Sequence, residues 1–344
     1  GRLRGSYVRV GESDQAMSEF EVYGYEAYRQ RIYEDLRPVD GATRADFDGD
    51  RLTEYMIKLR RVKHNVVNVD EERLLETQGM TKGGVPTIAG LLMLGSYPQQ
   101  FFPQMSITAV VVQGKNIGDV GQRGERFVDN KRFEGTISQM LDGALQFVQR
   151  HMTVKTIIGD DGQRADESEY PIKAVREILL NALIHRDYSI HTQDSPIRLV
   201  MFDDRLELEN PGGLYGRLTL ETLGTVPADV RNPFLAGALE VMMEVENRFS
   251  GIPTIRAEMK RAHLDEPVFT DRGGIFKVVF YNQPISVDGI SDIEEEIIRY
   301  CKSPRTREEL ASHFGFESVG YFISEYIRPL VERGRLKMTL PIQS

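Results

Sequence analysis

Apolar side chains along this chain switch repeatedly between the helical period and the strand period. In residues 50–64 they recur every three or four positions, which predicts a helix with one buried face. The β-branched run Ile107–Val112 predicts a buried strand, and residues 132–151 return to the helical period. We therefore predict a mixed α/β region over residues 41–152, in which no catalytic or metal-ligand spacing stands out.

The second half of the chain contains the most regular helical pattern of the sequence. Val154–Ile158 predicts a strand, and the acidic, polar stretch 160–169 that follows it predicts a loop. Pro171 can open a helix, because its missing N–H costs little there. Ile172–His185 then keeps the helical period throughout, so a helix is predicted over these residues.

A hairpin and a long loop follow this helix. Residues 196–202 and 205–209 alternate with period two on either side of an Asp-Asp turn, which predicts two paired strands. The sequence Asn-Pro-Gly-Gly from Asn210 would end the second strand sharply. Beyond it we predict a loop over residues 217–232, a helix over 234–246 and a strand over 276–281.

The two ends of the chain have patterns of their own. Tyr7–Val10 has a short strand pattern, and an isolated strand lacks partners for its backbone groups. We therefore expect an upstream domain, with residues 1–40 as its remnant and a connecting segment. At the other end, helical patterns at 291–301, 306–314 and 317–332 precede a strand pattern at 335–340. This order is typical of a winged helix-turn-helix, which we predict for residues 284–344.

Composition narrows the classes of function. With 40% hydrophobic and 28% charged residues, the chain has ordinary soluble globular composition, and the apolar run at 88–95 is too short to span a bilayer. A single cysteine, Cys301, excludes an internal disulfide framework and a multi-cysteine zinc site, and favours a cytoplasmic location. The net charge of −9 excludes a generally basic nucleic-acid coat, so any such binding must be local.

The chemistry that the sequence offers lies in the second half. Glu177 and Asn181 are one helical turn apart and share a face of the predicted helix. Such a pair suits a magnesium ion that shares its oxygen ligands with substrate phosphates, and the carboxylate could orient a water for attack on a terminal phosphate. The alternative is a solvated helix face. Asn210 and Gly212 at the strand end would let the backbone approach a ligand, or they form a plain turn.

The run His185-Arg186-Asp187 directly follows this pair. It could serve acid/base or phosphate chemistry, but His and Arg are also favourable near the carbonyl end of a helix. We favour the capping interpretation, with Asp187 anchoring the adjacent loop.

Taken in order, these motifs resemble the GHKL (Bergerat-fold) ATP-binding domain. More closely, YPIKAVREILLNALIHRDYS, DRLELENPGGL, RNPFLAGAL and ENRFSGIPTIRAEMKRAHLDEPVF resemble the divergent GHKL-type (HATPase) domain of bacterial transcriptional regulators that are often labelled RecG-related ATP-dependent DNA helicases. In that family a Schlafen AlbA-type domain comes first. GRLRGSYVRVGESDQAMSEFE resembles the end of such a domain, and TIAGLLMLGSYPQQFFP resembles the region that links it to the ATPase-like domain.

The resemblance implies an α+β fold and a nucleotide site. The fold would comprise a mixed α/β linker domain, a GHKL (Bergerat)-like α/β sandwich over residues 153–283 and a C-terminal winged helix-turn-helix. Glu177 would be the general base, and Asn181 would be the magnesium ligand. Asn210 would stand where the family usually has an aspartate that contacts the adenine amino group, followed by Gly212. Gly251 would be the last glycine of the phosphate-facing loop.

Two further positions differ from the family pattern. Phe249 stands where a glycine is usual in the phosphate-facing loop, and Leu214 replaces a second glycine after the strand. ATP and magnesium are nevertheless the cofactors that the resemblance implies.

The expected function is a cytoplasmic, nucleotide-responsive transcriptional regulator. Its partners would be nucleotide, DNA (mainly through the missing N-terminal domain) and a second copy of the chain, with no membrane. An ATP-hydrolysing enzyme that acts on nucleic acid and a degenerate scaffold that binds no nucleotide are the alternatives. The expected recognition helix lacks Arg, Asn or Gln at its start, so DNA contacts by this module would be limited to Arg333, Arg335 and Lys337. A docking or dimerisation role for the module stays equally open.

Overall fold

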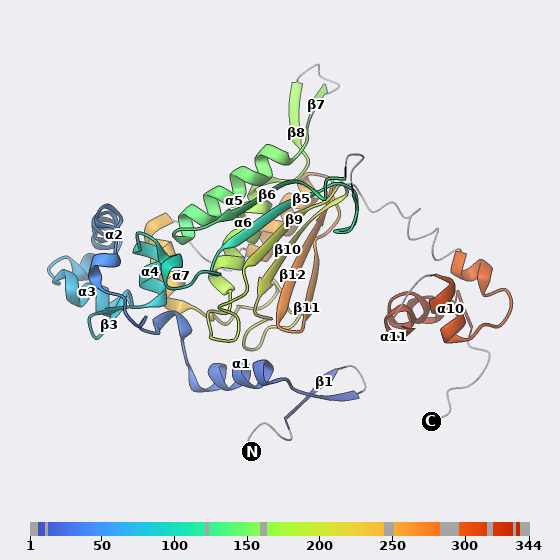
Figure 1. Ribbon diagram of the computed structural model, residues 1–344, viewed down its shortest axis with the longest axis horizontal. Helices are drawn as coiled ribbons and strands as arrows, with labels where there is room; N and C mark the ends of the chain where they lie inside the picture. Colours follow the sequence, from blue (N-terminus) through green and yellow to red (C-terminus); the bar gives the residue numbers. More distant parts are fainter. Residues whose placement is uncertain are drawn as a thin grey trace. The chain divides into compact units, whose positions relative to one another are not determined.

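The computed structural model describes residues 6–10, 13–120, 124–158, 164–243, 251–282, 296–314, 319–332 and 335–337 (Figure 1). The chain divides into two compact units, residues 1–282 and 283–344. Over the described ranges, no helix is both long and apolar enough to cross a membrane.

A six-stranded sheet organises the first unit. Its order is β11-β12-β10-β9-β5-β6, and neighbouring strands are antiparallel except for the parallel pair β5 and β9. The strands are β5 (Ile107–Val112), β6 (Phe127–Phe133), β9 (Ile197–Met201), β10 (Arg205–Pro211), β11 (Val268–Arg272) and β12 (Ile275–Tyr281). The sheet therefore draws strands from both sides of the domain boundary predicted after residue 152.

Helices cover one face of this sheet. They are α5 (Ile137–His151), α6 (Ile172–His185) and α8 (Gly251–Arg261), and α6 packs against both of the others (Figure 1). Side chains alternate between the two faces of a strand, so Leu206, Leu208 and Asn210 of β10 share the helix-covered face. All three are buried. The hairpin β9–β10, which the sequence predicts, thus places Asn210 on the helix-covered face of the sheet.

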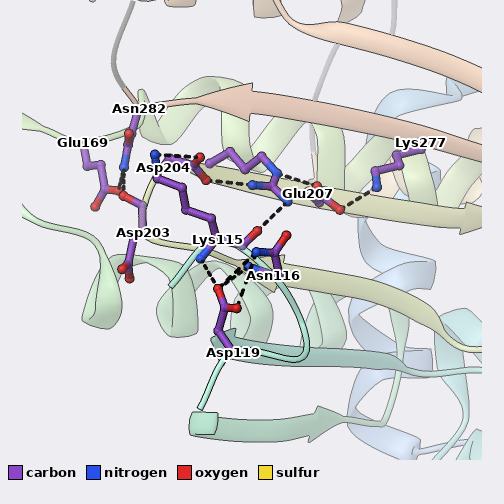
Figure 2. Close-up of polar contacts among 10 residues, drawn as sticks. Lys115, Asn116, Asp119, Glu169, Asp203, Asp204, Glu207, Lys277 and Asn282 are labelled. Carbon is purple, nitrogen blue, oxygen red and sulfur yellow. Dashed lines mark hydrogen bonds and ion pairs between the residues drawn. The ribbon is translucent and has the colours of Figure 1, made fainter. Parts of the chain in front are cut away.

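The opposite face of β10 carries an ion-pair network, which Figure 2 shows beside the hairpin turn. The guanidinium of Arg205 donates to Asp204 and to Glu207, and Lys277 Nζ lies 2.5 Å from Glu207 Oε2. Although burial opposes ionisation of Glu207, the hydrogen bonds from Lys277 and Arg205 keep the pKa of its carboxyl below the usual value. The network ties β10 to β12 and leaves the other face of β10 free for the apolar core.

The first unit also contains further helices and short strands. They are β1 (Tyr7–Val10), β2 (Ser13–Ala16), α1 (Glu19–Gln30), α2 (Gly49–Val62), α3 (Glu71–Thr77), β3 (Thr81–Lys82), β4 (Val85–Pro86), α4 (Ile88–Leu94) and α7 (Pro233–Met243). β1 pairs with β2, so the predicted strand Tyr7–Val10 has a partner within the chain. α7 comes from the second half of the sequence but packs against α2 and α4 (Figure 1). Buried residues from Val39 to Phe280 form one continuous core.

Two predictions of local structure need correction, and one strand was missed. The predicted loop 160–169 contains β8 (Arg164–Ser168), which pairs with β7 (Val154–Ile158) in a two-stranded ribbon. Backbone pairing with a neighbour stabilises this strand although its sequence is polar. The helix predicted from residue 132 begins at Ile137, because residues 127–133 form the edge strand β6. Strand β11 was not predicted at all.

The second unit is a small helical cluster. Residues 296–300 are helical and are followed by α10 (Arg307–His313), α11 (Val319–Phe322), a π-helical turn (Ile323–Ile327) and α12 (Arg328–Glu332). The predicted capping box between Thr306 and Glu309 is present at the start of α10. In the predicted strand 335–340, residues 335–337 are not in a strand and 338–340 lie outside the described residues. The winged helix therefore remains a prediction.

Candidate functional site

Glu177 and Asn181 lie one turn apart on the side of α6 that packs against α8. Asn181 Nδ2 is 3.4 Å from Glu177 Oε1, and both residues are half-buried. Gly251 is the first residue of α8. A Cβ atom built on it would lie 2.9 Å from both of these side-chain atoms. The lack of a side chain at Gly251 therefore allows the backbone of α8 to approach the pair.

The environment of Glu177 suits a proton acceptor. Burial raises the pKa of its carboxyl above the usual value, against the opposing effects of Arg176 and of the hydrogen bond from Asn181. A carboxylate whose pKa moves toward neutrality is a stronger general base near neutral pH.

Asn210 lies near the end of β10 with 4% of its surface exposed. Its Oδ1 atom is buried and has no hydrogen-bond partner. A buried polar atom without a partner costs about 1–3 kcal/mol, and a donor on a bound ligand would remove that cost. Sequence reasoning placed a polar residue at this strand end, but it gave no indication that the atom is unpaired.

Gly212 allows the turn after β10. Its φ of 107° is a conformation that favours glycine, and a Cβ atom there would collide with the side chains of Arg231 and Asp187. Gly212 N also donates to Gly274 O over 2.7 Å, which extends the pairing beyond β10. The turn therefore tightly joins β10 to the loop that follows.

A cavity of about 210 Å³ lies between α6, the end of β10, α8 and the loop after β10. Four of the predicted site residues line it: Asn181, Asn210, Gly212 and Gly251. Glu177 is not in its wall but contacts Asn181. The rest of the wall is mostly apolar and includes Ile178, Leu208, Leu223, Ile252, Phe269, Phe276 and Val278. An apolar cavity with a few convergent polar groups is typical of a small-molecule site.

The loop 213–232 forms one side of this cavity and is tied at both ends. Asp229 accepts hydrogen bonds from the backbone N–H and the guanidinium of Arg217, at 3.0 to 3.1 Å. Arg231 donates to Gly213 O over 2.9 Å and lies with its guanidinium over the ring of Tyr215. The loop is therefore closed on itself, although its central residues form no helix or strand.

Asn232 anchors the end of the loop to the end of α6. It is fully buried, and its Nδ2 donates to Ile184 O and Arg186 O over 2.7 and 2.8 Å. Asn232→Ala should lower the free energy of unfolding by about 2–3 kcal/mol, because two buried carbonyls lose their donor. Urea unfolding followed by circular dichroism measures this. The exposed Asn116→Ala is the control and should change it by less than about 0.5 kcal/mol; an equal effect of both variants would contradict the anchoring role.

The run that follows α6 mainly organises the next loop. The Arg186 guanidinium is buried and donates to Ser195 O and Thr192 O, at 2.7 and 3.0 Å. Asp187 Oδ1 accepts from Ser189 N over 2.8 Å. The prediction that Asp187 anchors the adjacent loop is confirmed, whereas Arg186 binds carbonyls of that loop instead of the end of α6.

His185 lines the cavity, which its position at a helix end did not suggest. Burial, with a contribution from Arg231, lowers the pKa of its imidazole to about 4. The ring is therefore neutral at physiological pH, with one donor and one acceptor nitrogen. Its spacing of one turn from Asn181 was the signal in the sequence that could have identified it.

The other residues that the sequence singled out lie in different places. Leu214 is half-buried in the cavity wall, while Phe249 and Arg333 lie outside the described residues. Arg335 and Lys337 are exposed in the second unit. Within the described part of the chain, no cluster of three or more His, Cys, Asp or Glu could hold a metal ion.

Comparisons with known proteins match two segments of the chain to protein families and the fold to a solved structure. Residues 194–280 match the family described as "Putative ATP-dependent DNA helicase recG C-terminal", and residues 26–108 match a domain of unknown function (DUF8451). Among curated proteins none matches significantly. The crystal structure of the DIP2311 protein from Corynebacterium diphtheriae is similar, with 20% identity and a TM-score of 0.55. The similarity covers 96% of this chain and 65% of that one.

These matches support the ATPase-type domain that the sequence predicted. The segment 194–280 contains Asn210, Gly212 and Gly251, and Glu177 and Asn181 precede it. The solved structure supports the mixed α and β fold alone. Residues 194–280 are thus similar to the RecG C-terminal ATPase-type family.

Proposed function

We propose that this protein binds ATP together with magnesium in the cavity between α6, β10 and α8, as a nucleotide-responsive regulator. The observation that carries the proposal is the buried, unpaired Oδ1 atom of Asn210 in an otherwise apolar cavity. Asn181 and Gly251 line the same cavity. The family match at residues 194–280 supports ATP as the ligand.

The residues present suit both parts of this ligand. Asn210 Oδ1 would accept a hydrogen bond from the amino group of the base, while the apolar wall excludes water from the ring faces. Asn181 would supply one oxygen ligand to magnesium, which commonly takes its other ligands from phosphates and water. The open backbone at Gly251 would face the phosphates beside Asn181.

The regulatory part of the proposal concerns the loop 213–232. This loop lines the cavity, so a bound nucleotide would change its conformation and the surfaces beside it. DNA contacts would come from an AlbA-type domain upstream and, to a smaller extent, from residues 284–344, where Arg335 and Lys337 are exposed. The family resemblance of the sequence supports this arrangement.

ATP hydrolysis is the second candidate function. Glu177 favours it, because its carboxylate contacts Asn181 and burial raises its pKa. A water held by this carboxylate would lie beside the proposed phosphate position, and Glu177 would accept its proton.

Calorimetric titration with ATP, ADP and GTP in magnesium, combined with a phosphate-release assay, separates these functions. Binding of ATP without turnover supports the regulator. Turnover supports the hydrolase, and Glu177→Ala should then reduce it by about 100-fold or more while ATP still binds, since a general base contributes roughly 10²–10⁴-fold. No heat of binding at millimolar ATP would contradict both functions. Turnover unchanged in Glu177→Ala would reject this carboxylate as the base.

A further inference from the structure

Helix α7 connects the two segments that bound the candidate site. The loop 213–232 leads directly into Pro233, and residues 244–250 separate the end of α7 from Gly251. Residues from outside α7 bind both of its ends. Both ends receive charged side chains from the first third of the chain.

Asp35 caps the start of α7 from a distant part of the sequence. Its Oδ2 accepts hydrogen bonds from Phe234 N and Leu235 N over 2.8 and 2.9 Å. These N–H groups belong to the first helical turn and have no partner within the helix, while Pro233 has no N–H to satisfy. A negative charge at this end also complements the helix dipole.

Lys58 of α2 binds the opposite end of the same helix. Its Nζ donates to Met242 O over 2.7 Å, and a positive charge complements the carbonyl end of a helix dipole. Asp35 and Lys58 both lie in the segment 26–108, whereas α7 lies in the segment 194–280. The two matched segments therefore meet in a pair of charge-assisted contacts, which we call the α7 clamp.

Asp35 holds the start of α7 from a buried position. The side chain is fully buried, and its other oxygen, Oδ1, has no partner. Burial raises the pKa of the carboxyl to about 6, although the N–H donors of Leu235 and Phe234 act in the opposite direction. The fold thus retains a buried carboxylate in a position where its contacts hold one end of α7.

We infer that Asp35 and Lys58 are positioning residues, through which the segment 26–108 fixes helix α7 and the loop 213–232 beside the nucleotide cavity. This inference rests on the proposed function for its effect on ATP. Release of either end of α7 would loosen that helix and the loop 213–232 that leads into it. A change in the first third of the chain would then alter nucleotide affinity without contact with the nucleotide.

The test compares Asp35→Ala, Asp35→Asn and Lys58→Met with the control Asp46→Ala in the full chain. Asp46 lies in the same segment, and its carboxylate accepts hydrogen bonds from Thr43 and Gln100, neither of which belongs to α7. Hydrogen exchange reports on residues 213–243, and calorimetry gives the dissociation constant for ATP with magnesium. Circular dichroism confirms that each variant is folded.

We expect Asp35→Ala and Lys58→Met to speed exchange in residues 213–243 and to weaken ATP binding by about fivefold or more. Asp35→Asn, which keeps an acceptor oxygen, should restore part of both properties, and Asp46→Ala should change neither. Folded variants with unchanged exchange in residues 213–243 would overturn the inference. If the unmodified chain binds no ATP, the proposed function fails. The exchange measurement then still tests whether Asp35 and Lys58 hold α7 and loop 213–232.

Discussion

Replacement of Gly251 by alanine should weaken ATP binding about 5- to 150-fold while leaving the fold almost as stable as before. The added Cβ would lie 2.9 Å from Glu177 Oε1 and from Asn181 Nδ2. Both are the far ends of flexible side chains, so the protein can accommodate the methyl group by moving them. That movement displaces the proposed magnesium ligand, and the expected loss of affinity corresponds to about 1–3 kcal/mol of binding free energy.

Gly237→Ala is the matched control for this experiment. Gly237 lies inside α7, and no atom is within 4 Å of a Cβ built there. Alanine should raise the free energy of unfolding by about 0.5–1 kcal/mol, because glycine is unfavourable inside a helix, and it should leave ATP affinity unchanged. Calorimetric titration of both variants measures the contrast. Equal ATP affinity in Gly251→Ala and the unmodified chain would show that α8 does not face the phosphates.

Replacement of Asn210 by leucine should change stability and ligand binding in opposite directions. Leucine removes the unpaired Oδ1 atom and keeps a branched side chain beside the apolar wall, so the free energy of unfolding should rise by about 1 kcal/mol. ATP binding should weaken about 10-fold or more, because the base loses its hydrogen-bond acceptor, at about 1.5 kcal/mol or more. Urea unfolding and calorimetry measure the two effects independently.

Asn210→Asp tests whether the acceptor oxygen is what matters. An aspartate keeps that oxygen, so this variant should retain ATP binding. A leucine variant that is less stable and binds ATP as tightly as the unmodified chain would contradict the role of Asn210. The same conclusion would follow if the aspartate variant lost binding to the same degree as leucine.

The order of the helix and hairpin that form the site was predictable from the sequence, because these elements have strong local periodicity. Ile172–His185 folds as α6 with the predicted bounds, and the hairpin forms as β9 and β10. The turn residues after Asn210 act as expected, since Gly212 adopts a conformation that favours glycine. The periodicity of each segment and its turn residues are therefore sufficient to predict these elements.

The elements that were missed depend on partners far along the chain. Edge strands β6 and β11 have weak alternation, and the polar strand β8 forms by pairing with β7. Similarly, nothing local indicates that Asp35 caps α7 almost two hundred residues later, or that Asn210 Oδ1 is left unpaired. Such contacts follow from packing between elements, which the pattern of one segment does not contain.

The most direct test of the nucleotide site is the magnesium dependence of ATP affinity in the full chain. Calorimetric titrations with ATP are compared in magnesium and in EDTA, for the unmodified protein and for Asn181→Ala. We predict that magnesium strengthens binding about 10-fold or more in the unmodified protein, and that Asn181→Ala loses most of this gain. An absence of binding at millimolar ATP, or a gain from magnesium that is the same in both proteins, would contradict the account.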